Sequence, residues 1–133
     1  RRDQGGSGGA GNIAPGTVQD FSVNVGDRVY FLVDQTTLTP EAQETLRRQA
    51  EWLKQYSKVT VQVEGHADER GTREYNIGLG ERRAQAVRRA LALQGVPDQQ
   101  VPTVSYGEER PAMAGDTEEA FGQNRRVEIV YGN

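Results

Sequence analysis

Alternating apolar and polar residues mark the first expected strands of this chain. Residues 21–25 place phenylalanine or valine at every second position, as a short strand would. A turn is expected at Gly26, and the apolar run at residues 29–33 is typical of a more buried strand. We therefore expect ordered structure to begin near Val18.

Two longer stretches carry apolar residues at helical spacing. The first contains Ala42, Leu46, Ala50, Leu53 and Tyr56. Its start is indicated by the Thr-Pro-Glu sequence at residues 39–41, which supplies a hydroxyl cap, a proline at the first helical position and an acid near the helix N-terminus. A second helix is expected over residues 73–93, ended by Gly95 and Pro97.

Three further strands are expected at residues 59–64, 101–106 and 126–131. The segment 107–122 is expected to be a polar loop with one helical turn near residues 117–120. Strands that alternate with two long helices imply one layer of helices against one sheet. A right-handed crossover would make the strand after the second helix parallel to the strand before it. The expected fold class is therefore α/β, a two-layer sandwich with a mixed sheet.

Composition narrows the classes of protein that fit. The glycine-rich residues 1–17 are expected to be a flexible linker, and residues 18–133 are sized for one domain. A net charge of −3 with mixed acids and arginines disfavours nucleic-acid binding. No cysteine is present, which excludes disulfides and thiolate metal sites. There is no apolar run long enough to span a bilayer and no signal peptide, and the chain starts at Arg1, so we expect a processed or trimmed form.

One stripe of the second helix mixes apolar residues with an arginine. The positions that share this stripe are Asn76, Leu79, Arg83, Val87 and Ala90. A guanidinium among apolar positions costs free energy unless a carboxylate meets it. Arg83 is therefore expected either to bind a ligand carboxylate at a cleft or to pair internally with Asp68 or Asp34.

Two acids follow the ends of expected strands, where open α/β sheets present ligand groups. Asp68 follows the strand that ends at about residues 64–66, and it can hold a ligand ammonium or cap the turn at Gly71. Asp34 follows the strand 29–33 and either lines the same cleft, together with the hydroxyl of Thr36, or caps the entry to the first helix. An ammonium site beside a carboxylate site would suit an amino acid.

Catalytic and metal sites have little support. His66 is the only histidine, and without cysteine it lacks the further ligands that a zinc site needs, so a turn or core histidine is favoured. Ser57 and Ser105 have no nucleophile motif around them, and one histidine cannot define a triad. Glu64 and Asp68 as paired acids for glycoside cleavage lack a supporting aromatic groove. We expect a protein that is not an enzyme and needs no cofactor.

Several motifs occur in a detailed order along the ordered part of the chain. They are Val29-Tyr-Phe31, Gly65-His-Ala-Asp-Glu-Arg-Gly-Thr72, Glu74-Tyr-Asn76, Leu79-Gly-Glu-Arg-Arg-Ala84, Val104-Ser-Tyr-Gly-Glu-Glu-Arg-Pro111 and Asn124-Arg-Arg126. Together they resemble OmpA-like peptidoglycan-binding domains, and most of all those of the peptidoglycan-associated lipoproteins (Pal). The resemblance covers residues 18–131.

The resemblance implies the βαβαβ sandwich of that family, with both helices on one face, and a ligand. That ligand is the meso-diaminopimelate of peptidoglycan stem peptides, whose side-chain end carries a free ammonium and a carboxylate. By position, Asp68 matches the acid that binds the ammonium and Arg83 the arginine that binds the carboxylate. Further pocket positions are matched by Asn76, Leu79, Asp34 and, more weakly, Thr36. Many relatives have an acid where this chain has Leu32, a departure at the rim of the pocket.

The resemblance also implies a cellular setting. It places the domain at the periplasmic face of the Gram-negative outer membrane, with a lipid anchor outside this chain and with TolB and other Tol proteins as partners. Three alternatives stay open. The same domain could belong to an outer-membrane porin or a flagellar stator protein, the chain could be a cell-wall hydrolase, or it could be a purely structural domain in which Arg83 pairs internally.

Overall fold

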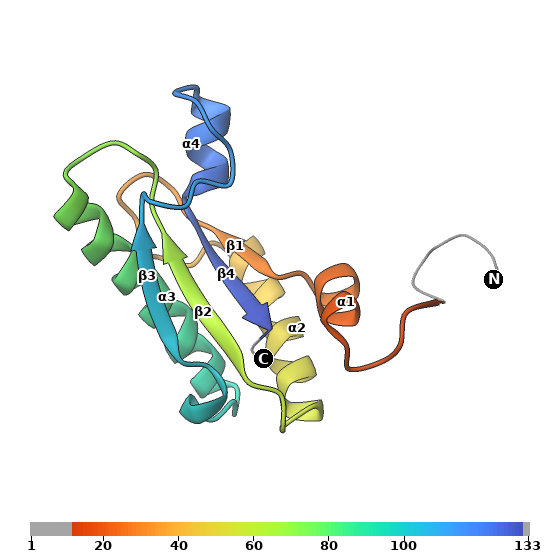
Figure 1. Cartoon of the computed structure of the whole chain (residues 1–133). Coiled ribbons are helices and arrows are strands. Elements are labelled where there is room, and N and C mark those ends of the chain that lie inside the picture. The colour runs from red at the N-terminus through yellow and green to blue at the C-terminus, as the bar shows by residue number, and fades with distance from the viewer. Residues whose placement is uncertain (1–11, 132–133) are drawn as a thin grey trace.

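Residues 12–131, which the computed structural model describes, form a four-stranded mixed sheet with two long helices on one face (Figure 1). The elements in chain order are α1 Val18–Asp20, the π-helical turn η2 Phe21–Val25, β1 Arg28–Tyr30, α2 Pro40–Gln55, β2 Val61–His66, α3 Arg73–Leu93, the 3₁₀ turn η3 Asp98–Gln100, β3 Thr103–Gly107, α4 Glu118–Asn124 and β4 Arg126–Tyr131. Most of the expected linker, residues 1–11, lies outside the described residues.

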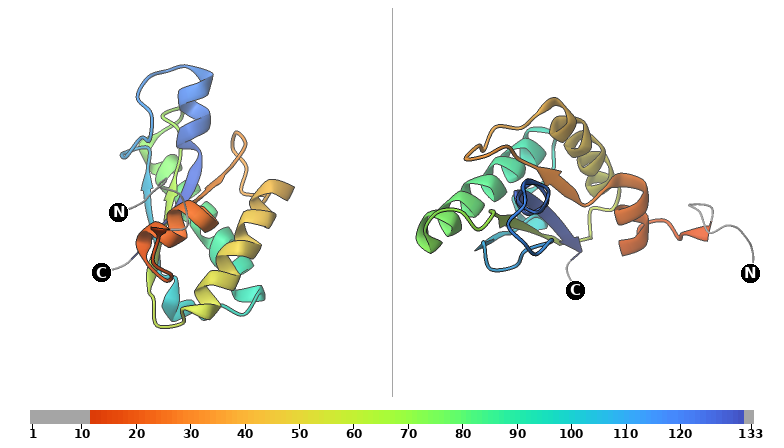
Figure 2. Two further views of the ribbon diagram at one scale, coloured as in Figure 1. Left: turned by 90° about the vertical axis from the view of Figure 1, so that its right-hand side faces the viewer. Right: turned by 90° about the horizontal axis from the view of Figure 1, so that it is seen from above.

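The strands are ordered β1-β4-β2-β3 across the sheet. β2 runs parallel to β3, and β4 is antiparallel to both β1 and β2. Seen from above, α2 and α3 lie on the same side of the sheet (Figure 2). The expected two-layer α/β sandwich and the expected parallel pair are therefore confirmed. No helix in the described part of the chain is long and apolar enough to cross a membrane.

Both long helices begin at a threonine cap. The Thr39 hydroxyl accepts a hydrogen bond from the Ala42 amide at 3.1 Å, and Pro40 occupies the first helical turn of α2. The Thr72 hydroxyl accepts one from the Tyr75 amide at 3.1 Å and starts α3. The helices expected from about residue 40 to 56 and from 73 to 93 are thus confirmed.

Two glycines let α3 pack directly on β2. A Cβ atom on Gly65 would lie 1.8 Å from the carbonyl oxygen of Gly80, so no side chain fits between the two backbones. Around this contact, the core contains Val61 and Val63 of β2 and Val87 of α3, all fully buried. The close approach fixes the start of α3 beside the end of β2, where the candidate site lies.

The prediction of a strand at residues 21–25 is wrong. This segment is helical, and only Phe21 is buried, whereas Val23 is 59% exposed. The side chain of Asp20 accepts hydrogen bonds from the Gly16 amide and the Trp52 indole, at 2.8 and 2.9 Å. These contacts hold a helical turn against α2, and the period-2 pattern was too short to exclude it.

β1 is shorter than the strand expected at residues 29–33, because the chain leaves the sheet after Tyr30. Leu32 and Val33 are exposed, and the Gln35 amide donates to the Leu32 carbonyl in a turn. Asp34 has a φ of 56°, in the left-handed region.

The segment 107–122 also differs from the expectation. It contains more than one helical turn, since α4 runs from Glu118 to Asn124 behind a Thr117 cap.

Candidate functional site

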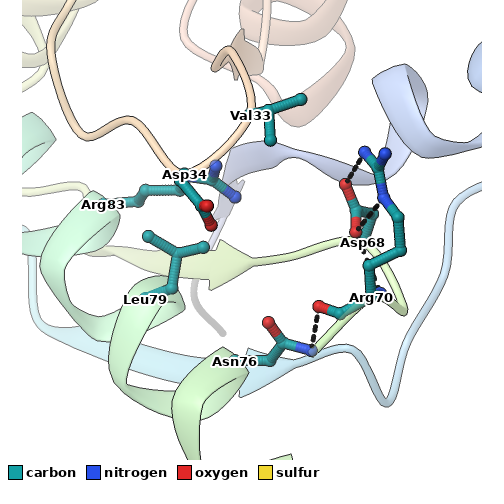
Figure 3. Close-up of a pocket in the computed structure, with 7 residues that line it drawn as sticks. All are labelled: Val33, Asp34, Asp68, Arg70, Asn76, Leu79 and Arg83. Carbon is teal, nitrogen blue, oxygen red and sulfur yellow. Dashed lines mark hydrogen bonds and ion pairs between the residues drawn. The ribbon is translucent and has the colours of Figure 1, made fainter. Parts of the chain in front are cut away.

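A pocket of about 250 Å³ opens at the end of the sheet where β2 leads into α3 and where the loop after β1 passes (Figure 3). Its lining residues are Val33, Asp34, Asp68, Arg70, Asn76, Leu79 and Arg83. In Figure 3, Asp68 and Arg70 border one side, and Arg83 and Leu79 border the other. Two acids and two arginines therefore face one small space.

Arg83 is fully buried, and backbone carbonyls hold its guanidinium. Nε donates to the Gln35 carbonyl at 2.9 Å, Nη1 to His66 at 3.0 Å and Nη2 to Leu32 at 3.0 Å. An arginine has five N–H groups, so two have no hydrogen-bond partner among the described residues. No ion pair in residues 12–131 involves this side chain, and the carboxylate pairing considered above is not formed.

Burial lowers the pKa of Arg83 to about 10, and the charge of Arg125 acts in the same direction. The negative charges of Asp68 and Asp34 oppose this shift. Arg83 therefore stays a cation at neutral pH. It is a fixed positive charge with unused donors, which is what a carboxylate ligand requires.

Asp68 is only 7% exposed and accepts hydrogen bonds from two arginines. Oδ1 accepts from the Arg70 amide at 3.0 Å and from its Nε at 3.2 Å. Oδ2 accepts from Arg70 Nη2 at 2.8 Å and from Arg125 Nη1 at 3.4 Å. The bond from the Arg70 amide shows that Asp68 also shapes its turn, one of the two roles expected for it.

Burial acts to raise the pKa of Asp68, but the hydrogen bonds and charge of Arg70, with the hydrogen bond from Arg125, outweigh it. The pKa is lowered below its ordinary value as a result. Asp68 is thus ionised at any pH near neutrality and can attract an ammonium group.

An acid, an amide and an apolar side chain also line the pocket. The Asp34 carboxylate accepts a hydrogen bond from the Tyr75 hydroxyl at 3.1 Å. Asn76 is buried, and its Nδ2 donates to the Arg70 carbonyl at 3.0 Å and to Glu108 at 2.6 Å. Leu79, also buried, supplies an apolar wall. Asn76 therefore fixes the backbone that carries Arg70.

Five of the six expected site residues line this pocket: Asp34, Asp68, Asn76, Leu79 and Arg83. Thr36 does not line it, and its role in ligand binding stays a prediction. The sequence interpretation missed Arg70, which lies two residues after Asp68 and pairs with it. The signal that was not used is the Asp-x-Arg spacing at a strand end, because such a spacing permits a local ion pair.

His66 is a core residue rather than part of the pocket. Its carbonyl holds Arg83, while its buried ring packs against Tyr106 at 5.7 Å between centroids. Neither ring nitrogen has a hydrogen-bond partner among the described residues. Burial lowers the pKa of His66 to about 4, so the ring is neutral at pH 7. Within residues 12–131 no three His, Cys, Asp or Glu side chains are grouped as metal ligands would be.

Comparison with known proteins agrees with this fold. Residues 30–125 match the OmpA family. A peptidoglycan-associated lipoprotein of Agrobacterium fabrum is 54% identical over 127 residues, which are 96% of this chain and 72% of that protein.

Solved structures give the same result. The crystal structure of the peptidoglycan-associated lipoprotein from Burkholderia pseudomallei aligns with a TM-score of 0.77 and 43% identity, covering 80% of this chain and 90% of that one. The C-terminal domain of Helicobacter pylori MotB aligns with a TM-score of 0.74 and 25% identity, covering 80% and 84%. The chain belongs to the OmpA family, and peptidoglycan-associated lipoproteins resemble it over most of its length.

Proposed function

We propose that this domain binds the meso-diaminopimelate residue of peptidoglycan stem peptides without catalysis, and so attaches an outer membrane to the cell wall. The observation that carries the proposal is that one pocket is lined both by an ionised Asp68 and by a buried Arg83, two of whose N–H groups have no partner among the described residues. The names of the similar proteins, which associate them with peptidoglycan, support the same assignment.

The chemistry of the ligand matches the two charges. The side-chain end of meso-diaminopimelate carries an ammonium and a carboxylate on one carbon, so both must be met within a small space. Asp68 would accept from the ammonium, and Arg83 would donate to the carboxylate. Leu79 and Val33 would contact the methylene groups, and Asn76 and Asp34 would line the remaining sides.

The expected affinity for one stem peptide is modest. A hydrogen bond to a charged group contributes roughly 1.5–3 kcal/mol, and ordering the ligand offsets part of that gain. Strong retention on the wall would come from many ligand copies facing a tethered protein. In this proposal the tether is a lipid anchor outside the chain, the domain is at the periplasmic face of the outer membrane, and TolB and other Tol proteins are its protein partners.

The first test compares variants for co-sedimentation with purified diaminopimelate-type sacculi. Asp68→Asn keeps the shape of the side chain but removes its charge, and Arg83→Lys keeps the charge but removes the planar fork of donors. Each variant is expected to bind at least tenfold more weakly than the unmodified domain. Arg82→Lys, on the exposed neighbour of Arg83, is the matched control and is expected to bind normally. Normal binding by both pocket variants would exclude the proposed site.

Two rival assignments have direct tests. The likeness to MotB keeps a stator-type context open, and the sequence of the full gene, with or without a flanking transmembrane helix, distinguishes it. A hydrolase would release soluble muropeptides from sacculi incubated with the purified domain. We expect no release, since no serine, threonine or cysteine among the described residues lines the pocket, and the lowered pKa of Asp68 is opposite to what a general acid needs.

A further inference from the structure

We propose that Arg70 is a specificity-determining residue of this pocket, which occupies the ammonium position of Asp68 in the free protein and must leave it when a ligand binds. The inference rests on the proposed function, because it assigns the ligand ammonium to Asp68. It adds an internal competitor that sets how tightly an ammonium-bearing ligand binds.

The Asp68 carboxylate already accepts as many hydrogen bonds as it can. A carboxylate has about four lone-pair positions, two on each oxygen. Each oxygen of Asp68 already accepts two hydrogen bonds. Of these four bonds, three come from Arg70 and one comes from Arg125. An incoming ammonium therefore has to displace one of these donors.

Among the donors to Asp68, the Arg70 side chain is the one that can move. The Arg70 amide is part of the backbone turn, and the Arg125 side chain is 9% exposed and also donates to the Phe31 carbonyl at 2.9 Å. The Arg70 side chain, in contrast, is 44% exposed. Its two side-chain hydrogen bonds to Asp68, drawn in Figure 3, are therefore the ones that we expect a ligand to displace.

Two residues of α4 can hold the Arg70 guanidinium after it leaves Asp68. The Arg70 guanidinium carbon lies 4.2 Å from the centre of the Phe121 ring, and Nη1 lies 4.0 Å from a Glu118 oxygen. Both partners belong to α4, so a cation–π contact and a second carboxylate remain available after Asp68 is released. The exchange replaces one cation by another at Asp68, and the buried carboxylate is never left unpaired.

The test measures the affinity of a soluble tripeptide that ends in meso-diaminopimelate, and of the same tripeptide with its side-chain amine acetylated. For Arg70→Gln we expect about three- to tenfold tighter binding of the free amine, because a partly exposed ion pair no longer competes. The acetylated peptide cannot use Asp68 and should bind Arg70→Gln and the unmodified domain equally. Arg73→Gln is the matched control, since this exposed arginine pairs with Glu109 and does not line the pocket.

Weaker or unchanged binding of the free amine by Arg70→Gln would overturn the inference, since Arg70 would then hold the ligand itself or not compete. If the unmodified domain binds neither peptide, the proposed function fails. The competition is then decided by a methylammonium titration followed through the side-chain carboxyl carbon resonance of Asp68. A larger response in Arg70→Gln than in the unmodified domain supports competition, and equal responses contradict it.

Discussion

Arg83 and Asp68 are held in opposite ways, although both are buried charges. Arg83 is fixed by three backbone carbonyls from two different segments of the chain, so its position is set by the fold. Asp68 is neutralised mainly by Arg70, a partly exposed side chain. In the proposed site, the group that would bind the ligand carboxylate is therefore fixed by the fold, whereas the main partner of the group that would bind the ammonium is partly exposed.

Replacement of Arg83 should affect stability as well as binding. Lysine cannot reach all three carbonyls, and each buried acceptor left unsatisfied costs about 1–3 kcal/mol. We expect Arg83→Lys to lower the free energy of unfolding in urea by at least about 1 kcal/mol. Arg82→Lys, on the exposed neighbour, should change it by less than about 0.5 kcal/mol. Equal stability of the two variants would show that the carbonyl contacts of Arg83 do not support the fold.

His66 should make the protein sensitive to mild acid. Its pKa is about 4 in the folded state and near 6.5 when unfolded, so between these values the unfolded chain binds the extra proton. Stability is therefore full above pH 6.5 and falls as the pH drops toward 4, by about 3 kcal/mol. Burial raises the pKa of Glu64, which works in the opposite direction.

The comparison of the unmodified domain with His66→Phe isolates the histidine. Phenylalanine keeps a ring against Tyr106 but does not titrate. Urea unfolding at pH 7, 6, 5 and 4 should show a smaller loss of stability for the variant. Parallel pH profiles would mean that His66 is not buried in its neutral form.

The helices and strands that have several agreeing sequence signals were predicted correctly, whereas a segment with one short signal was not. The capped helices α2 and α3 combine a threonine cap with several turns of periodic apolar residues, so several signals agree. The segment 21–25 contains only three alternating apolar residues. The hydrogen bond from the Trp52 indole to Asp20, a tertiary contact, holds the adjoining turn against α2. The carbonyl partners of Arg83 could not be predicted either, because a residue pattern does not contain the geometry of loops.

The contact between α3 and β2 predicts opposite effects for two glycines. A methyl group on Gly65 would collide with the Gly80 backbone, and overpacking of this kind costs about 1–3 kcal/mol. A methyl group on Gly78 would meet only the flexible end of Arg82 at 3.3 Å, and alanine favours the helix by up to about 1 kcal/mol. Thermal unfolding should show a lower Tm for Gly65→Ala and an equal or higher Tm for Gly78→Ala. A lowered Tm in both variants would contradict this packing.

In the whole molecule, the described N-terminal segment and the pocket lie apart. α1 lies beside α2, whereas the loop between β2 and α3 that carries Asp68 is at the far end of the sheet (Figure 1). A tether attached before α1 would leave the pocket free to face a ligand. The domain would then be attached at one end and could bind a ligand at the other end at the same time.

This arrangement predicts a large effect of anchoring. Domains coupled to vesicles through the N-terminus should retain sacculi at least 100-fold more strongly than the free domain, because bound neighbours raise the effective concentration. The measurement is sedimentation of sacculi with vesicles at equal protein concentration. Vesicles that carry Arg83→Lys are the control for non-specific attachment. Equal retention by free and anchored domains would contradict the tethering role.

The most direct test of the diaminopimelate site leaves the protein unchanged and varies the ligand. Calorimetry would compare stem peptides that end in meso-diaminopimelate, in lysine, which lacks the side-chain carboxylate, and in diaminopimelate with an acetylated amine. Loss of one charge-assisted contact should weaken binding about 10- to 100-fold for each altered peptide. If all three peptides bind with the same affinity, Asp68 and Arg83 do not recognise the two charges and the proposed site is wrong.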